Sequence, residues 1–135
     1  MSKPKLSPSI WLAPACALAL VVTSPSVYAF NWKRLVKTDA LSLYVDMTTL
    51  ERDGDVRRIW EMQDLANPDP NGVRSRRYVN EIDCKQKYHR IGNMTSFSGP
   101  KLTGERRFEV EDMGYWRRVP PDGTFAVSYV LLCVD

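Results

Sequence analysis

Apolar and polar residues alternate along most of the chain after residue 30, and this pattern predicts a series of short β-strands. Residues 41–45, Leu-Ser-Leu-Tyr-Val, alternate in the way that a half-buried strand does. In the longer run at residues 56–65, Ile59 and Trp60 are expected to point to opposite faces of a sheet. Further strands are predicted at residues 31–38, 73–84, 85–97 and 102–110. For residues 46–52 we expect a short helical turn at most.

Turn-forming residues separate these strands and limit how they can connect. Residues 53–55 read Asp-Gly-Asp, and the loop at residues 67–72 combines two prolines with an Asn-Gly turn. Residues 98–100, Ser-Gly-Pro, form another turn. Because parallel strands need longer crossover connections, the short links predict an antiparallel sheet of about six strands in meander order.

The last segment, residues 124–133, fits two patterns. Phe125, Val127 and Tyr129 alternate as in a strand. Ala126, Tyr129 and Val130 instead fit the spacing of one helix face, and the preceding Pro-Pro-Asp is typical of a helix start. The pattern of residues alone leaves both structures open.

The N-terminal residues have the composition of an export signal. Lys3 and Lys5 precede an apolar stretch at residues 10–22, and small residues suit a cleavage site between Ala29 and Phe30. An apolar stretch of 13 residues is shorter than the roughly 20 needed to span a bilayer as a helix. We therefore predict a cleaved signal peptide at residues 1–29, a single domain at residues 30–135, and a periplasmic or secreted protein that does not span the membrane.

The three cysteines divide between these two parts. Cys16 lies inside the apolar stretch, with Ala13 where a lipoprotein signal would carry leucine, which disfavours a lipid anchor in the outer membrane. Cys84 and Cys133 are the only cysteines after the signal, and an exported protein meets oxidising conditions. The sequence therefore predicts one disulfide between them, which would stabilise the domain by about 4 kcal/mol in the chain-entropy model.

The charge balance excludes some classes of partner. The whole chain has a net charge of +3, but Lys3 and Lys5 lie in the signal and all 16 acidic residues follow it. The domain after the signal is therefore nearly neutral, and it lacks the strong positive charge of a nucleic-acid-binding domain. The seven glycines are isolated, so no glycine-rich phosphate loop is present and no cofactor is predicted.

Residues that could support catalysis or bind a metal ion are sparse. The single histidine, His89, lies between cations in a predicted strand, where we expect an exposed side chain rather than a general base. A zinc site would need three or four ligands, and both cysteines of the domain are expected to be oxidised. Glu109, Glu111 and Asp112 do not have the spacing of a calcium loop. No catalytic residue and no metal site are predicted.

Arginine doublets are the most informative polar feature. They occur at positions 57–58, 76–77, 106–107 and 117–118. Adjacent residues of a strand point to opposite faces, so each doublet is expected to place one arginine on each side of the sheet. One interpretation is cross-strand pairing with the glutamates at positions 61, 81, 105 and 109.

A second interpretation is a binding surface. Arg, Trp and Tyr are enriched in binding hot spots, and we expect exposed aromatic side chains at Trp60, Tyr78, Tyr88 and Trp116. The residues predicted to contact a partner are Arg76, Arg77, Arg106 and Trp116. An acidic glycan or lipid, or a protein, would suit such a surface. Pairing of sheet faces into a homodimer would also cover the aromatic residues.

Several short motifs follow one another in order along the predicted domain. They are Trp32, Tyr44-Val45-Asp46, Thr49-Leu50, Gly54-Asp55-Val56-Arg57, Ile59-Trp60, Ile82-Asp83-Cys84, Phe97-Ser98-Gly99, Gly104-Glu105, Tyr115-Trp116-Arg117-Arg118-Val119-Pro120 and Cys133. This ordered set resembles the surface-adhesin protein E family of small exported bacterial proteins. The resemblance implies an antiparallel sheet with a C-terminal helix, an α+β, mainly β fold. It also implies adhesion to host matrix proteins.

Three hypotheses about function follow. The first is an exported, non-enzymatic binding module of the cell envelope that is adhesin-like and recognises a protein or an acidic glycan or lipid. The second is a structural or assembly protein of the envelope that acts by self-association. The third is a small periplasmic hydrolase that uses His89.

Overall fold

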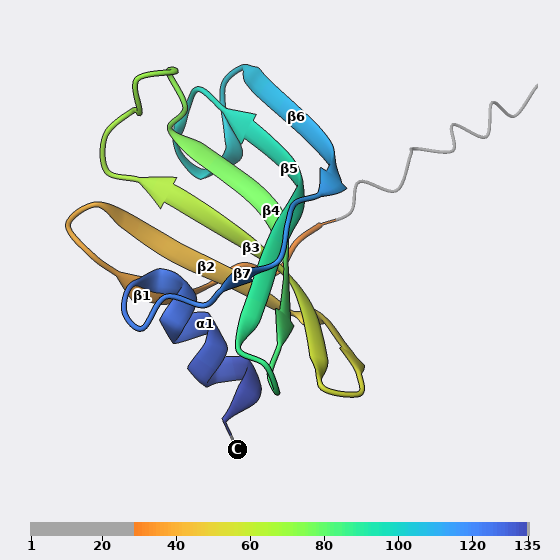
Figure 1. The fold of residues 1–135 in the computed structure, drawn as a ribbon. Coiled ribbons are helices and arrows are strands. Elements are labelled where there is room, and N and C mark those ends of the chain that lie inside the picture. Colours follow the sequence, from red (N-terminus) through yellow and green to blue (C-terminus); the bar gives the residue numbers. More distant parts are fainter. Residues whose placement is uncertain (1–28, 135) are drawn as a thin grey trace, which may run out of the picture.

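An antiparallel sheet in meander order forms most of the structure, a computed structural model that describes residues 29–134 (Figure 1). Its elements are β1 (Lys33–Lys37), β2 (Leu41–Asp53), β3 (Val56–Leu65), β4 (Ser75–Asp83), β5 (Tyr88–Phe97), the 3₁₀ helix η1 (Pro100–Leu102), β6 (Arg106–Met113), β7 (Arg117–Arg118) and the helix α1 (Thr124–Cys133). The strands pair in the order β1-β2-β3-β4-β5-β6, and the short β7 also pairs with β5. This confirms the predicted fold. The predicted signal sequence up to residue 28, including Cys16, lies outside the described residues.

Helix α1 packs on one face of this sheet, which we call the helix face (Figure 1). Val45, Ile59 and Ile82 from three neighbouring strands are almost completely buried there against Leu132 of α1. The ambiguous C-terminal segment is therefore a helix, as the family resemblance implied. Burial of an apolar side chain of this size stabilises a fold by roughly 1.5–3 kcal/mol, so this cluster attaches the helix to the sheet.

A disulfide supplements this packing. Cys84 follows β4, and Cys133 is the last residue of α1. Their sulfur atoms are 2.05 Å apart and their Cα atoms 5.3 Å apart, which confirms the predicted pairing. The bond joins the C-terminal end of the helix to the turn between β4 and β5.

The prediction for residues 46–52 was wrong, because β2 continues through them to Asp53. The pairing of β2 with β3 is irregular between Asp46 and Glu51. At this bulge the buried carboxylate of Asp46 accepts hydrogen bonds from the backbone and the hydroxyl of Thr48, at 3.0 and 2.6 Å. After the bulge, β2 pairs with β3 again from Glu51 to Asp53, and this pairing keeps the segment extended although its local sequence is typical of a turn.

The strand predicted at residues 102–110 is also displaced. Residues Pro100–Leu102 form η1, and β6 begins only at Arg106. The hydroxyl of Ser75 accepts a hydrogen bond from the backbone amide of Leu102 at 2.8 Å, which holds η1 against β4. No helix in the described part of the chain is long and apolar enough to cross a membrane.

Candidate functional site

The face of the sheet opposite α1 carries a concentration of arginine and aromatic side chains, and we call it the arginine face. Residues of β3, β4 and β5 that pair directly form rows across this face. In one row, Glu81 lies between Arg58 and Arg90. The Glu81 carboxylate pairs with Arg58 at 3.4 Å and with Arg90 at 3.0 Å. Two guanidinium groups therefore share one carboxylate, so this row has a net positive charge.

Aromatic rings pack against the guanidinium groups of this face. The guanidinium carbon of Arg90 lies 4.6 Å from the centre of the Trp116 ring. That of Arg77 lies 5.6 Å from the centres of both the Phe30 and the Trp60 rings. These distances are within the range of cation–π attraction, which is worth about 0.5–1 kcal/mol at exposed sites. Stacking of this kind restricts each guanidinium plane while its N–H edges remain able to donate.

The N-terminal residues of the domain contribute to this arrangement. The rings of Phe30 and Trp32 are stacked, with centres 4.6 Å apart, and Phe30 meets Trp60 edge-on at 5.4 Å. The backbone amide of Asn31 donates to the carboxylate of Asp46 at 2.9 Å, which fixes the segment on β2. This contribution of the N-terminal residues was not predicted from the sequence. Asp46, which directly follows the apolar run at residues 41–45, is the residue that could have indicated it.

Arg106 extends the surface to the edge strand β6. Its side chain is 66% exposed and lies 3.8 Å from the carboxylate of Glu109. Thr95 pairs with both Arg77 and Glu109, so these three residues form a row on the arginine face. Burial lowers the pKa of the Arg77 guanidinium, and the charge of Arg106 lowers it further. A negatively charged ligand would relieve the repulsion between these two arginines.

Trp116 marks the other end of the surface. It follows β6 and is 42% exposed. Beside it is a hollow of about 550 Å³, which Trp116 lines together with Asp83, Gln86 and Tyr88. The arginine face therefore has a hollow at its Trp116 end.

The structure does not bring all four predicted contact residues together. Arg76 lies on the helix face, where its Nε donates to the Gln63 side chain at 2.9 Å. Its neighbour Arg77 lies on the arginine face, in agreement with the expectation that a doublet divides between the two sides. Arg77, Arg106 and Trp116 remain on one surface.

Glu61 and Tyr78 depart from the expected arrangement. Glu81 pairs with arginines of neighbouring strands, as expected, whereas Glu109 pairs with Arg106 of its own strand and Glu61 pairs with no arginine of the described residues. Glu61 is fully buried on the helix face, where Tyr78 and Asn80 donate to its carboxyl oxygens at 3.0 and 2.8 Å. The expectation that Tyr78 is exposed was therefore also wrong, since Phe125 of α1 packs edge-on against its ring.

Burial controls protonation in this cluster. Burial raises the pKa of Glu61, and the hydrogen bonds from Asn80, Ser128 and Tyr78 offset only part of this effect. Burial also raises the pKa of Tyr78 well above its usual value, so its hydroxyl remains a donor. A neutral Glu61 carboxyl is compatible with these neutral partners, and no arginine or lysine of the described chain forms an ion pair with it.

The expectation that His89 is exposed was wrong, because only 6% of the residue is accessible. Strand alternation places it on the helix face, where its ring lies 4.6 Å from that of Phe125 and its Nδ1 is 3.3 Å from the Asn80 side-chain oxygen. Burial lowers the pKa of His89, and the nearby charge of Arg117 adds to the effect. Helix α1 covers the imidazole of His89, which contacts the Phe125 ring and the Asn80 side chain and does not face an open cleft.

Residues 29–134 contain no group of three or more histidine, cysteine or acidic side chains that could hold a metal ion. The described side chains that come together on the arginine face are mainly arginines and aromatic rings, with the carboxylates of Glu81 and Glu109 among them. This chemistry suits the binding of anionic groups.

The family model for surface-adhesin protein E matches residues 32–134, which is nearly the whole described domain. The chain belongs to the surface-adhesin protein E family. This is a family of exported or surface proteins, and membership supports an adhesin-like, non-enzymatic protein. No curated protein matches the chain by sequence.

Solved structures of Haemophilus influenzae protein E have a similar fold. Crystal form II of that protein superposes with a TM-score of 0.55 at 18% identity, covering 76% of this chain and 86% of the other. The protein from a non-typeable strain gives a TM-score of 0.52 at 18% identity, covering 81% and 79%. At this identity the likeness establishes the fold that surface-adhesin protein E members share.

Proposed function

We propose that this surface-adhesin protein E member is an exported binding module without enzymatic activity, and that it recognises an acidic protein, glycan or lipid through the arginine face. The observation that supports this most strongly is the stacking of Arg77 and Arg90 on aromatic rings. Restricted arginines lose less conformational entropy when they bind an anion, and Arg and Trp are typical of binding hot spots.

Arg77, Arg106 and Trp116 are the proposed contact residues, and Arg76 supplies a matched control. Arg76 and Arg77 are adjacent in sequence and both half-buried, but they lie on opposite faces of the sheet. If loss of any positive charge or loss of stability weakens ligand binding, substitution of either arginine should weaken it. If the ligand binds to the arginine face, only substitution of Arg77 should weaken binding.

The test compares the variants Arg77→Gln, Arg106→Gln, Trp116→Ala and Arg76→Gln by surface plasmon resonance. Immobilised heparin serves as an acidic glycan, anionic vesicles as an acidic lipid surface, and a reconstituted extracellular matrix as a protein surface. We expect each arginine-face variant to bind at least one probe roughly fivefold more weakly, the loss of about 1 kcal/mol. Affinity should also fall as salt rises, because exposed charges are screened over about 8 Å at physiological ionic strength.

Equal binding by Arg76→Gln and Arg77→Gln would contradict the proposal. So would parallel losses of melting temperature and affinity, because these would identify the arginines as structural pairs only. A hydrolytic activity that disappears in His89→Ala would show that the protein is an enzyme.

Self-association is the second candidate function, and the edge of the sheet favours it. Strand β6 is at the end of the strand order, and Phe108 and Val110 on it are 49% and 53% exposed. An exposed strand edge with apolar side chains is a template for pairing with another chain. Analytical ultracentrifugation of the wild type and of Val110→Lys would detect such an assembly and its loss.

Export of the domain by signal cleavage completes the proposal. Cleavage between Ala29 and Phe30 would make Phe30 the first residue, and its ring packs on Trp32 and Trp60 of the arginine face. Intact-mass measurement on protein recovered from the periplasm or the medium should give a chain that starts at Phe30. A diacylglyceryl mass on Cys16 would instead indicate a lipid-anchored surface protein.

A further inference from the structure

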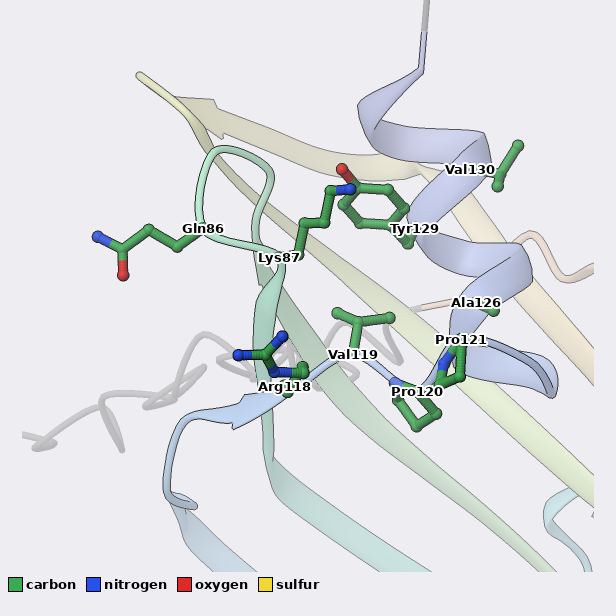
Figure 2. Close-up of a pocket in the computed structure, with 9 residues that line it drawn as sticks. All are labelled: Gln86, Lys87, Arg118, Val119, Pro120, Pro121, Ala126, Tyr129 and Val130. Carbon is green, nitrogen blue, oxygen red and sulfur yellow. The ribbon is translucent and has the colours of Figure 1, made fainter.

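A second cleft lies between α1, the turn that precedes β5, and the segment that follows β7 (Figure 2), and it shares Gln86 with the hollow beside Trp116. It has a volume of about 490 Å³, within the range of roughly 300–1,000 Å³ that is usual for small-molecule sites. Its lining residues are Gln86, Lys87, Arg118, Val119, Pro120, Pro121, Ala126, Tyr129 and Val130.

One side of the cleft is the outer stripe of the helix. Ala126, Tyr129 and Val130 are spaced three and four residues apart, so they share one face of α1. Phe125 and Leu132 belong instead to the buried side, where they contact the sheet. Val130 is 57% exposed, whereas Ala126 and Tyr129 are half-buried, so the domain leaves this apolar stripe partly uncovered.

The opposite side is also apolar and is held in place. Val119, Pro120 and Pro121 face the helix stripe across the cleft (Figure 2). The backbone amide of Val119 donates to the carbonyl of Lys87 at 2.8 Å, which joins this segment to the turn before β5. Two consecutive prolines restrict the backbone further, so the segment needs little additional ordering when a ligand binds.

The helix and the turn are also joined to each other. The hydroxyl of Tyr129 donates to the carbonyl of Cys84 at 3.3 Å, and Cys84 carries the disulfide to Cys133. Lys87 has a φ of 58°, in the left-handed region that few non-glycine residues adopt. The three segments that form the cleft are thus connected by a covalent bond and by hydrogen bonds.

The charged residues of the cleft are all of one sign. Lys87 and Arg118 are the ionisable cations among its lining residues, and none of those residues is acidic. Neither cation forms an ion pair with another residue in the range 29–134. An apolar cleft with two unpaired cations is complementary to a ligand that has one apolar group and one anionic group.

From this arrangement we propose that the cleft binds a single-chain anionic lipid, with its head group between Lys87 and Arg118 and its acyl chain against Val119, Pro120 and Val130. An arginine can contact a carboxylate or phosphate through two N–H groups, and the lysine adds a point charge. The acyl chain would cover the apolar stripe that the fold leaves partly exposed. A disordered acidic peptide with apolar residues is the alternative that the test must separate.

The test uses dodecanoate below its micellar concentration as the probe, with dodecanol and dodecyltrimethylammonium as neutral and cationic analogues of the same chain length. Titrations of the ¹⁵N-labelled, disulfide-bonded domain are followed by NMR. We expect dodecanoate to shift the amides of Lys87, Val119, Ala126 and Val130, and to bind at least tenfold more tightly than either analogue. If dodecanoate binds at one site in the cleft, the shifts of these four amides should saturate at the same dodecanoate concentration.

Substitutions then assign the head-group contacts. Lys87→Gln and Arg118→Gln should each weaken dodecanoate binding roughly fivefold, the upper range for an exposed charge pair. Lys85→Gln removes an exposed lysine from the same turn that does not line the cleft, so this control should bind as the wild type does. Ala126→Leu should reduce the affinity for the acyl chain by partly filling the cleft.

Several results would overturn the proposal. Equal affinity for the anionic and cationic analogues would show non-specific adsorption of the chain. Amide shifts confined to the arginine face would place the lipid on the other surface and leave this cleft without a role. Binding of a synthetic acidic peptide, without binding of dodecanoate, would assign the cleft to a peptide. Because the arginine-face variants are tested separately, failure of either proposal leaves the other standing.

Discussion

Replacing Glu61 by glutamine should change how the stability of this domain depends on pH. Glu61 is completely buried beneath α1, and neutral groups from Tyr78, Asn80 and Ser128 surround its carboxyl. Glutamine has nearly the same shape and retains an oxygen that can accept from Asn80. Its amide group can donate to the Tyr78 hydroxyl, which is able to accept as well as donate. The variant therefore removes the ionisable group with little change in packing.

The sign follows from the direction of the pKa shift. Burial raises the pKa of Glu61 in the folded state above its ordinary value of 4.5. Between these two values the folded protein holds a proton that the unfolded chain has released, so the free energy of unfolding falls as pH rises. The stabilisation is complete below the unfolded value and is lost as pH rises through the folded one. Glu61→Gln should not show this loss.

The magnitude has an upper limit per pH unit. One proton contributes at most about 1.4 kcal/mol of unfolding free energy for each pH unit between the two pKa values. For a domain of this size that corresponds to roughly 5 °C or more in melting temperature per unit. The variant should match the wild type near pH 4 and become progressively more stable than it as pH increases.

Urea unfolding at intervals from pH 4 to pH 8 measures this difference. Glu105→Gln removes an exposed carboxyl and serves as the control, with an unfolding free energy that should stay close to the wild type throughout. Parallel curves for the wild type and Glu61→Gln would contradict a raised pKa of Glu61 in the folded state. A variant that becomes progressively less stable than the wild type as pH rises would show that the hydrogen bonds keep Glu61 ionised.

Three further predictions concern other parts of the fold. Replacing Cys84 and Cys133 by serine should lower the free energy of unfolding by roughly 4 kcal/mol, measured by urea unfolding under identical conditions, because the unfolded chain is no longer cross-linked. Gly92→Ala should lower it by about 1–3 kcal/mol, because the added Cβ would lie 2.4 Å from the β6 backbone; a melting temperature equal to that of the wild type would contradict this. Burial and Arg117 lower the pKa of His89 below its ordinary value of 6.5, so its contribution to stability is complete above that value and is lost as pH falls through the folded one. The difference in unfolding free energy between the wild type and His89→Gln should therefore decrease on acidification, and a constant difference would argue against a neutral buried imidazole.

Most of the strands, their order along the sheet and the disulfide could be predicted from the local pattern of residues. The run at residues 56–65 became β3 with the predicted bounds, because strand alternation is a local property and clear turns bordered it on both sides. The Cys84–Cys133 pairing followed because these are the only two cysteines in the described residues 29–134. The adjacent arginines at 76 and 77 divided between the two faces for the same local reason, the period of two residues in a strand.

Contacts between residues that are distant in the chain determine which face of the sheet is covered and what each buried polar group contacts. His89 and Tyr78 look like exposed strand residues in sequence, but they lie under α1, and the position of a helix on a sheet depends on contacts between distant residues. Glu61 lacks the expected arginine partner because the arginines nearest to it in sequence point elsewhere or pair with Glu81. The strand at residues 46–52 required pairing with β3 to overcome a turn-like sequence. Alternation tells which residues share a face, and long-range packing determines whether that face meets the helix or the solvent.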